Sequence, residues 1–98
     1  MVIISKKTLE DFSKLYPISI EPLNTWYEQV KAADWRNGTE LRNDFPTADF
    51  VGDNRWVFNI KGNHFRLVAM IFFNVRTVFI RFIGTHAEYD KIKNIKNI

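Results

Sequence analysis

The sequence predicts a single α+β domain, spanning residues 1–98, with the element order β-α-α-β-β-β-α. Two observations predict this class. The first half carries apolar residues at helical spacing, and prolines and the Asn37-Gly38 pair divide it into separate elements. From Arg55 to Ile83 the chain instead alternates in the manner of a β-sheet. We therefore expect a mainly antiparallel sheet with two N-terminal helices packed on one face and a short C-terminal helix.

The N-terminal part is expected to contain one strand and two helices. Val2–Ile4 is a short apolar run that predicts the first strand, and Ser5 is a candidate cap for the following helix, which ends at Pro17. Ser19 is a candidate cap for the second helix, which ends before Asn37-Gly38. The apolar positions of the two helices are Leu9, Phe12, Leu15 or Tyr16, Leu23, Trp26, Tyr27, Val30 and Ala33.

The segment between the second helix and the sheet carries weaker signals. Thr39 is a candidate cap for a single helical turn that carries Leu41 and Phe45 and ends at Pro46. Residues 46–54 are predicted to form a loop. No internal repeat or low-complexity stretch occurs along the chain.

A β-hairpin followed by a third strand is predicted in the second half. Arg55–Lys61 and His64–Phe73 are the hairpin strands, joined by a two-residue turn at Gly62-Asn63. A further turn at Asn74-Val75 leads into the third strand. The first turn pairs Lys61 with His64, Asn59 with Arg66, and Phe58 with Leu67.

This register divides the side chains of the meander between two faces of the sheet. One face is wholly apolar and must pack against the two helices. It carries Trp56, Phe58, Ile60, Phe65, Leu67, Ala69, Ile71, Val78, Ile80 and Phe82. The opposite face combines an apolar patch with polar and basic groups. It carries Arg55, Val57, Asn59, Lys61, His64, Arg66, Val68, Met70, Thr77, Phe79, Arg81 and Ile83.

Charge is distributed unevenly along the chain. Residues 1–53 hold six Lys and Arg against nine Asp and Glu, a net of −3, whereas residues 54–98 hold eight against two, a net of +6. No acidic residue lies between Asp53 and Glu88. A concentrated positive potential attracts phosphate backbones, so the basic face predicts a polyanion as partner. The alternative is a basic surface that only aids solubility.

Several classes of function are disfavoured. The chain has no cysteine and only two histidines, which disfavours a zinc site and indicates a reducing compartment. The N-terminus does not resemble a signal peptide, and no apolar run approaches the roughly 20 residues of a membrane span. We therefore expect a cytoplasmic protein without membrane contact, metal or other cofactor. Metal-dependent nucleases need clustered carboxylates, whereas metal-free ribonucleases need only a base, an acid and cations.

The end of the last strand carries a candidate catalytic group. Thr85 and Glu88 form a Thr-x-x-Glu capping box, which predicts that a helix begins at this point. His86 and Tyr89 then share one face of its first turn. A neutral imidazole can accept a proton, and a phenol can orient or donate one. The alternative for His86 is capping or packing, and for Tyr89 it is packing against the sheet.

Arg66 is the third candidate catalytic residue, because a central strand position requires a partner or an anion for its guanidinium. Asp90 could be that partner, which is the structural alternative to phosphate binding. The tail after the helix has apolar residues every three positions and is either a fraying helix end or a partner-binding tail. The candidate RNA-binding residues are Asn59, Lys61, Arg81 and Lys91.

Two long strings carry a resemblance to a known family. They are Val57-Phe-Asn-Ile-Lys-Gly-Asn-His-Phe-Arg-Leu-Val68 and Ile80-Arg-Phe-Ile-Gly-Thr-His-Ala-Glu-Tyr-Asp-Lys91. The chain resembles the HigB family of type II toxins, which is similar in fold to RelE. The likeness extends over nearly the whole chain and includes Ile4-Ser5-Lys6, Trp26-Tyr27 and Ala33-Asp34-Trp35. His64 departs from the family pattern, in which Lys or Arg is commoner.

The resemblance implies an mRNA interferase that cuts translated mRNA on the ribosome without metal. It also implies a cognate HigA-like antitoxin with a helix-turn-helix domain, and contact with operator DNA only through the toxin–antitoxin complex. Arg66, Arg81, His86 and Tyr89 match the places of RelE-like active-site residues. Which residue is the general base and which the acid stays open. A non-catalytic RNA-binding module, with Phe79, Arg66 and Lys61 as its surface, is the main alternative, and an interaction-only protein is another.

Overall fold

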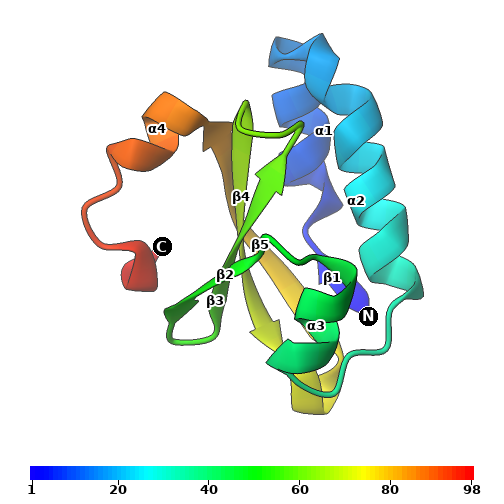
Figure 1. The fold of residues 1–98 in the computed structure, drawn as a ribbon. Helices are drawn as coiled ribbons and strands as arrows, with labels where there is room; N and C mark the ends of the chain where they lie inside the picture. The colour runs from blue at the N-terminus through cyan, green and yellow to red at the C-terminus, as the bar shows by residue number, and fades with distance from the viewer.

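A five-stranded mixed sheet forms the centre of the fold, with the strand order β1-β5-β4-β3-β2 (Figure 1). The structure is a computed structural model that describes residues 1–98. β1 runs parallel to β5, and the other neighbours are antiparallel. The strands are β1 (Val2–Ile4), β2 (Asp49–Gly52), β3 (Arg55–Ile60), β4 (Phe65–Phe72) and β5 (Thr77–Thr85). The predicted α+β class with a mainly antiparallel sheet is confirmed.

Two long helices cover one face of the sheet, and a short helix flanks the other (Figure 1). The helices are α1 (Lys6–Leu15), α2 (Ile20–Ala32), α3 (Gly38–Asp44) and α4 (His86–Asp90). Short 3₁₀ turns occupy Pro17–Ser19, Phe73–Val75 and Ile95–Asn97. The fold is compatible with that of RelE-like proteins, with α3 longer than the expected single turn and β2 added at the edge of the sheet.

The predicted helix caps are only partly correct. Ser5 stands at the N-terminus of α1, but its side chain makes no capping hydrogen bond. The Ser19 hydroxyl turns back to donate to the Tyr16 carbonyl oxygen at 2.7 Å. Thr39 is not the cap of α3, because the Asn37 side chain accepts from the Glu40 amide at 3.0 Å. An extended Asn37 places its short side chain within reach of the first helical N–H groups.

The loop predicted over residues 46–54 is wrong, because Asp49–Gly52 forms an edge strand on β3. A run of four residues is too short for alternation to reveal a strand, and β3 supplies its hydrogen-bond partners. The turn that follows did carry a signal. Gly52, Asp53 and Asn54 all have positive φ. Glycine, asparagine and aspartate are the residue types that adopt this conformation most readily. Asp53 and Asn54 join the end of β2 at Gly52 to β3.

The β3–β4 hairpin confirms two of the predicted pairs and corrects the third. Asn59 lies opposite Arg66, and Phe58 lies opposite Leu67. Lys61 does not pair with His64 in the ladder, because Lys61 leaves the strand with a φ of 52°. The His64 amide instead donates to the Lys61 carbonyl oxygen at 3.1 Å, closing a turn over residues 61–64.

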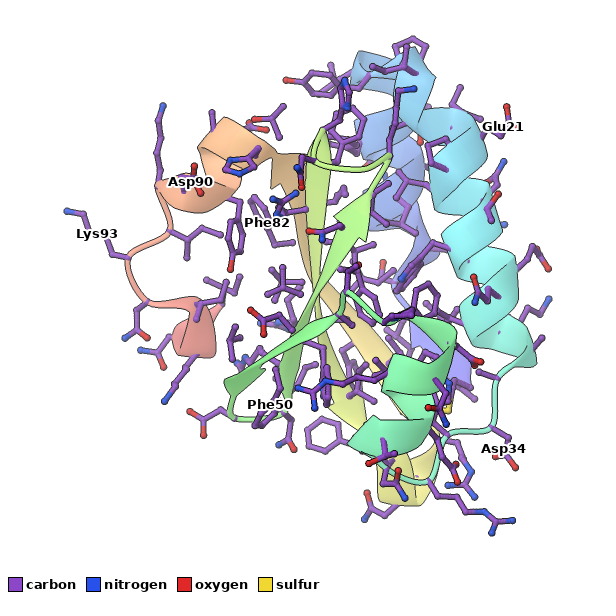
Figure 2. The ribbon with its side chains drawn as sticks, in the orientation of Figure 1. Glu21, Asp34, Phe50, Phe82, Asp90 and Lys93 are labelled. Atoms are coloured by element: carbon purple, nitrogen blue, oxygen red, sulfur yellow. The ribbon has the colours of Figure 1, made fainter.

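A β-bulge in β5 changes the predicted faces of its last residues. Ala69 lies opposite Ile80, but Val68 lies opposite Phe82, so Arg81 is the extra residue. One inserted residue reverses the alternation beyond it. Phe82 therefore lies on the sheet face that α4 flanks (Figure 2), and Ile83 packs against the helix-side core, the reverse of the prediction.

The core lies between the sheet and the helices α1, α2 and α3. Its aromatic rings meet edge to face, with Trp26 at 5.4 Å and Phe45 at 5.1 Å from Phe58. Tyr16 rather than Leu15 is the apolar partner at the end of α1, because Leu15 is 77% exposed whereas Tyr16 packs on the core. This packing occupies one face of the sheet completely and leaves the other to carry the site.

Candidate active site

The sheet face opposite α1 and α2, here called the open face, carries the predicted polar residues. Strand pairing aligns its members, because directly opposite residues share a face. The open face includes Asp49, Arg55, Val57, Asn59, Arg66, Val68, Met70, Phe72, Thr77, Phe79 and Phe82, with Gly84 opposite Arg66. α4 lies at one end of this face (Figure 1).

The apolar part of the open face is covered. Val57 and Val68 are 5% and 0% exposed, although neither belongs to the helix-side core. The C-terminal segment folds back toward this side of the sheet (Figure 1), and an Arg55 Nη2 group donates to the Ile98 carbonyl oxygen at 2.9 Å. The tail is therefore not a continuation of the helix, since α4 ends at Asp90. The polar groups beside α4 remain accessible.

The predicted capping box starts α4. The Glu88 amide donates to Thr85 Oγ1 at 3.1 Å, and the Thr85 amide donates to Glu88 Oε1 at 2.8 Å. Gly84 precedes the cap, and a β-carbon there would lie 2.5 Å from the Phe82 ring. The glycine thus permits close packing of Phe82 and places no side chain opposite Arg66. The result is a capped helix start that directly follows the tightly packed Gly84.

His86 is paired with Asp90 rather than free. Its Nδ1 lies 2.9 Å from Asp90 Oδ2, with the two side chains 49% and 57% exposed. Asp90 was the alternative partner for Arg66, and this interpretation is wrong because the carboxylate binds the imidazole. An exposed pair of this kind contributes little to stability. The pair matters more for the orientation of the imidazole. When Nδ1 donates to Asp90, the lone pair of Nε2 is available to accept a proton.

Arg66 has no carboxylate partner. Its guanidinium donates only to Asn63 Oδ1 and to the Phe65 carbonyl oxygen, each at 3.4 Å. Both bonds are long compared with a charge-assisted hydrogen bond of about 2.7–2.9 Å. The guanidinium is therefore available to bind an anion on the open face.

Tyr89 lies between charged groups of both signs. Burial raises the pKa of the Tyr89 phenol above its ordinary value of 10.0, the charges of Asp49 and Asp90 raise it further, and Arg66 opposes the shift. The phenol therefore stays protonated throughout the neutral range. The positive charge of Arg66 therefore acts on the phenol, and so do the negative charges of Asp49 and Asp90. Tyr89 is thus suited to donate a hydrogen bond or a proton.

Asp49 is the residue that sequence reasoning missed. It lies on β2 opposite Val57 and hence on the open face, and its charge acts on the Tyr89 phenol. The prediction of a loop over this segment hid it. Gly52-Asp53-Asn54 are residue types that favour a turn with positive φ, and they were the available signal for a β2–β3 hairpin. That hairpin would have placed Asp49 on a strand beside β3.

The other candidate residues are more scattered. Asn59 is exposed on the open face, but Lys61 lines a hollow with Ile18, Glu21, Pro22 and Thr25, on the helix side of the hairpin turn. Arg81 in the bulge and Lys91 after α4 are exposed and form no ion pair. The His64 ring nitrogen Nδ1 lies 3.0 Å from the Lys61 carbonyl oxygen, which ties this histidine into the turn.

Two further properties bear on the class of site. The fold does not group three or more His, Asp or Glu residues in a way that could hold a metal ion. None of its helices combines the length and the apolar character that crossing a membrane requires.

Comparison with known proteins identifies the family. The model of the HigB toxin family, described as the RelE-like toxic component of a toxin–antitoxin system, matches residues 19–92. An mRNA interferase HigB of Escherichia coli O6:H1 is 37% identical over 94 residues, covering 94% of this chain and 91% of the relative. Proteins named mRNA interferase HigB from Escherichia coli O157:H7 and Shigella flexneri are each 34% identical over 92 residues, covering 92% of this chain and 88% of the relative. The chain therefore belongs to the HigB family of toxins of toxin–antitoxin systems.

Proposed function

We propose that this toxin is an mRNA interferase, an endoribonuclease that cleaves translated mRNA on the ribosome. The observation that carries the proposal is the guanidinium of Arg66, which lies on the open face without a carboxylate partner and whose charge acts on Tyr89, while the His86–Asp90 pair lies on the same short helix as Tyr89. The names of the relatives support the same activity. Such a face combines an anion-binding group, a proton acceptor and a proton donor.

The proposed reaction is an attack by the ribose 2′-oxygen on the adjacent phosphorus. His86 Nε2 removes the 2′-hydroxyl proton, the P–O5′ bond breaks, and the departing 5′-oxygen receives a proton. Tyr89, whose raised pKa keeps it protonated, is the proposed donor to that oxygen. Arg66 stabilises the negative charge of the pentacovalent phosphorus. The products are a 2′,3′-cyclic phosphate and a 5′-hydroxyl.

Binding of the message is assigned to groups around this centre. Asn59 lies in the row of Arg66 on the open face. Arg81 supplies exposed charge in the β5 bulge opposite the middle of β4, and Lys91 supplies it directly after α4. Lys61 points toward a different hollow and would contact RNA beyond the open face. Phosphate contacts of this kind give affinity without base specificity.

Membership of the family implies a cognate antitoxin, and we propose that it is HigA-like with a helix-turn-helix domain. In that arrangement operator DNA is contacted only through the toxin–antitoxin complex. Because the proposed substrate is mRNA that is being translated, the proposed site of action is the cytoplasm.

Induced expression tests the function in cells. We expect growth arrest that is relieved by co-expression of the antitoxin, with new 5′ ends inside translated messages. The Arg66→Ala variant is the matched control. Growth arrest with intact messages would favour a non-catalytic RNA-binding module, and unimpaired growth at a verified protein level would contradict toxin activity.

Cleavage is expected to be independent of added transition metals, since the open face lacks a carboxylate cluster and the reaction supplies its own nucleophile. The measurement is cleavage of ribosome-bound mRNA in excess EDTA, with magnesium controlled separately so that ribosomes stay intact. A strict requirement for manganese, zinc or another added metal would contradict the mechanism.

A further inference from the structure

Two polar side chains lie next to each other at the free edge of the open face. Asp49 is opposite Val57, and Asn59 lies two residues further along β3, beyond the end of the β2 pairing. Diagonal neighbours of this kind on one face of an antiparallel pair lie within about 8 Å of each other. Because β2 begins at Asp49, the Asp49 carboxylate and the Asn59 amide lie side by side at this edge of the sheet.

Both side chains are exposed, and neither forms an ion pair or a side-chain hydrogen bond within the protein. A lone carboxylate beside a phosphate-binding surface repels the RNA backbone. That repulsion is offset when the carboxylate accepts hydrogen bonds from a nucleobase. Asp49 also lies close enough to the reaction centre for its charge to act on Tyr89, as the charge of Arg66 does. A base bound by Asp49 would thus flank the scissile phosphate.

The donor and acceptor pattern selects among the four bases. An ionised carboxylate only accepts hydrogen bonds, and it can accept two at once. The Watson–Crick edge of guanine presents two adjacent donors, N1–H and the N2 amino group, next to the acceptor O6. The Asn59 amide can donate to that O6. Adenine and cytosine present a ring-nitrogen acceptor where guanine presents N1–H, and uracil presents a single donor between two carbonyl groups.

We propose that Asp49 and Asn59 form a base-reading pair that selects an unpaired guanine next to the cleaved bond. Unpaired bases in single-stranded RNA are commonly read along their Watson–Crick edges in this way. The inference rests on the proposed function, and it adds a sequence preference to it.

The test uses ribosome-bound messages that differ at one nucleotide of the A-site codon. Each of the three codon positions in turn carries guanosine, adenosine or inosine. At one position we expect guanine to be cleaved roughly 5- to 150-fold faster than adenine, the discrimination of a good bidentate contact. Inosine, which lacks the N2 amino group, should fall between them. Asp49→Asn should remove the preference for guanine.

Asp53→Asn is the matched control. It removes the same charge from the β2–β3 turn, at a positive φ that asparagine tolerates, and should leave the preference unchanged. Equal cleavage of guanine and adenine messages at every position by the unaltered protein, or an unchanged preference in Asp49→Asn, would overturn the proposal.

A second measurement separates this inference from the proposed function. Guanosine 3′-monophosphate and inosine 3′-monophosphate are titrated into the free full-length protein, followed by amide chemical shifts. Tighter binding of the guanosine nucleotide, with shifts at Asp49 and Asn59, supports base reading even if no message is cleaved. Equal binding of the two nucleotides, or shifts confined to other residues, would overturn it even if cleavage is observed.

Discussion

Arg66→Ala is expected to abolish mRNA cleavage while the domain stays folded. Loss of one group that stabilises transition-state charge costs about 2.7–4 kcal/mol, or roughly 10²- to 10³-fold in rate. The folded state loses little, because Arg66 forms only two hydrogen bonds of 3.4 Å and no ion pair. Single-turnover cleavage of ribosome-bound mRNA and a thermal melt of the same preparation measure the two effects.

Arg76→Ala is the matched control for this result. Arg76 is ion-paired with Asp34 and donates to the carbonyl oxygens of Trp35 and Phe73, at 3.3 and 2.8 Å. It therefore connects the loop before α3 to the turn that follows β4. None of these contacts involves a residue of the proposed active site. We expect Arg76→Ala to lower the melting temperature and to leave the cleavage rate per folded molecule unchanged. An Arg66→Ala protein that melts far below the unaltered one would make Arg66 structural, and a folded variant that cleaves at the unaltered rate would exclude it from the chemistry.

His86→Gln and Tyr89→Phe are each expected to reduce the single-turnover rate by roughly 10²- to 10⁴-fold, the usual range for acid–base groups. The double variant should lose much less than the product of the two effects, because groups that act as a unit are not additive. Ribosome binding should change little, since phosphate contacts are assigned to other residues. Pre-steady-state cleavage beside a binding assay on the same ribosomes provides both numbers.

The pH dependence of these variants separates the two roles. Because burial raises the pKa of the Tyr89 phenol, this group stays protonated below its ordinary value of 10.0, and Tyr89→Phe should lower the rate evenly from neutral pH up to that value. His86→Gln should instead remove the rise of rate with pH that a general base produces. His64→Gln is the control, since that imidazole is bound to the Lys61 carbonyl oxygen in the turn. Full cleavage by His86→Gln would move the general base elsewhere on the open face.

The parts of the fold that the sequence predicts are those with local causes. The Gly62-Asn63 turn and the alternation on both sides of it determine that Asn59 lies opposite Arg66. The Thr85 capping box is contained within four residues, and it correctly places the start of α4. These two features are sufficient to predict that Arg66 and α4 belong to one end of the sheet.

The parts that escape prediction depend on distant contacts. The residue pattern of β5 is compatible with a regular strand and with a bulge at Arg81. The exchange of faces between Phe82 and Ile83 is therefore determined only by the pairing of β5 with β4. β2 exists because β3 offers an edge to Asp49–Gly52. The pairing of Asp90 with His86 rather than Arg66 is likewise a choice between two partners that spacing alone leaves open.

The chemistry of the cleaved ends tests the central claim most directly. Ribosomes carrying a defined mRNA are incubated with the purified toxin, and both new termini are identified by mass spectrometry and end labelling. Attack by the 2′-oxygen predicts a 2′,3′-cyclic phosphate and a 5′-hydroxyl at a cut within the A-site codon, absent with Arg66→Ala. Intact mRNA on toxin-bound ribosomes, or a 3′-hydroxyl paired with a 5′-phosphate, would contradict the account.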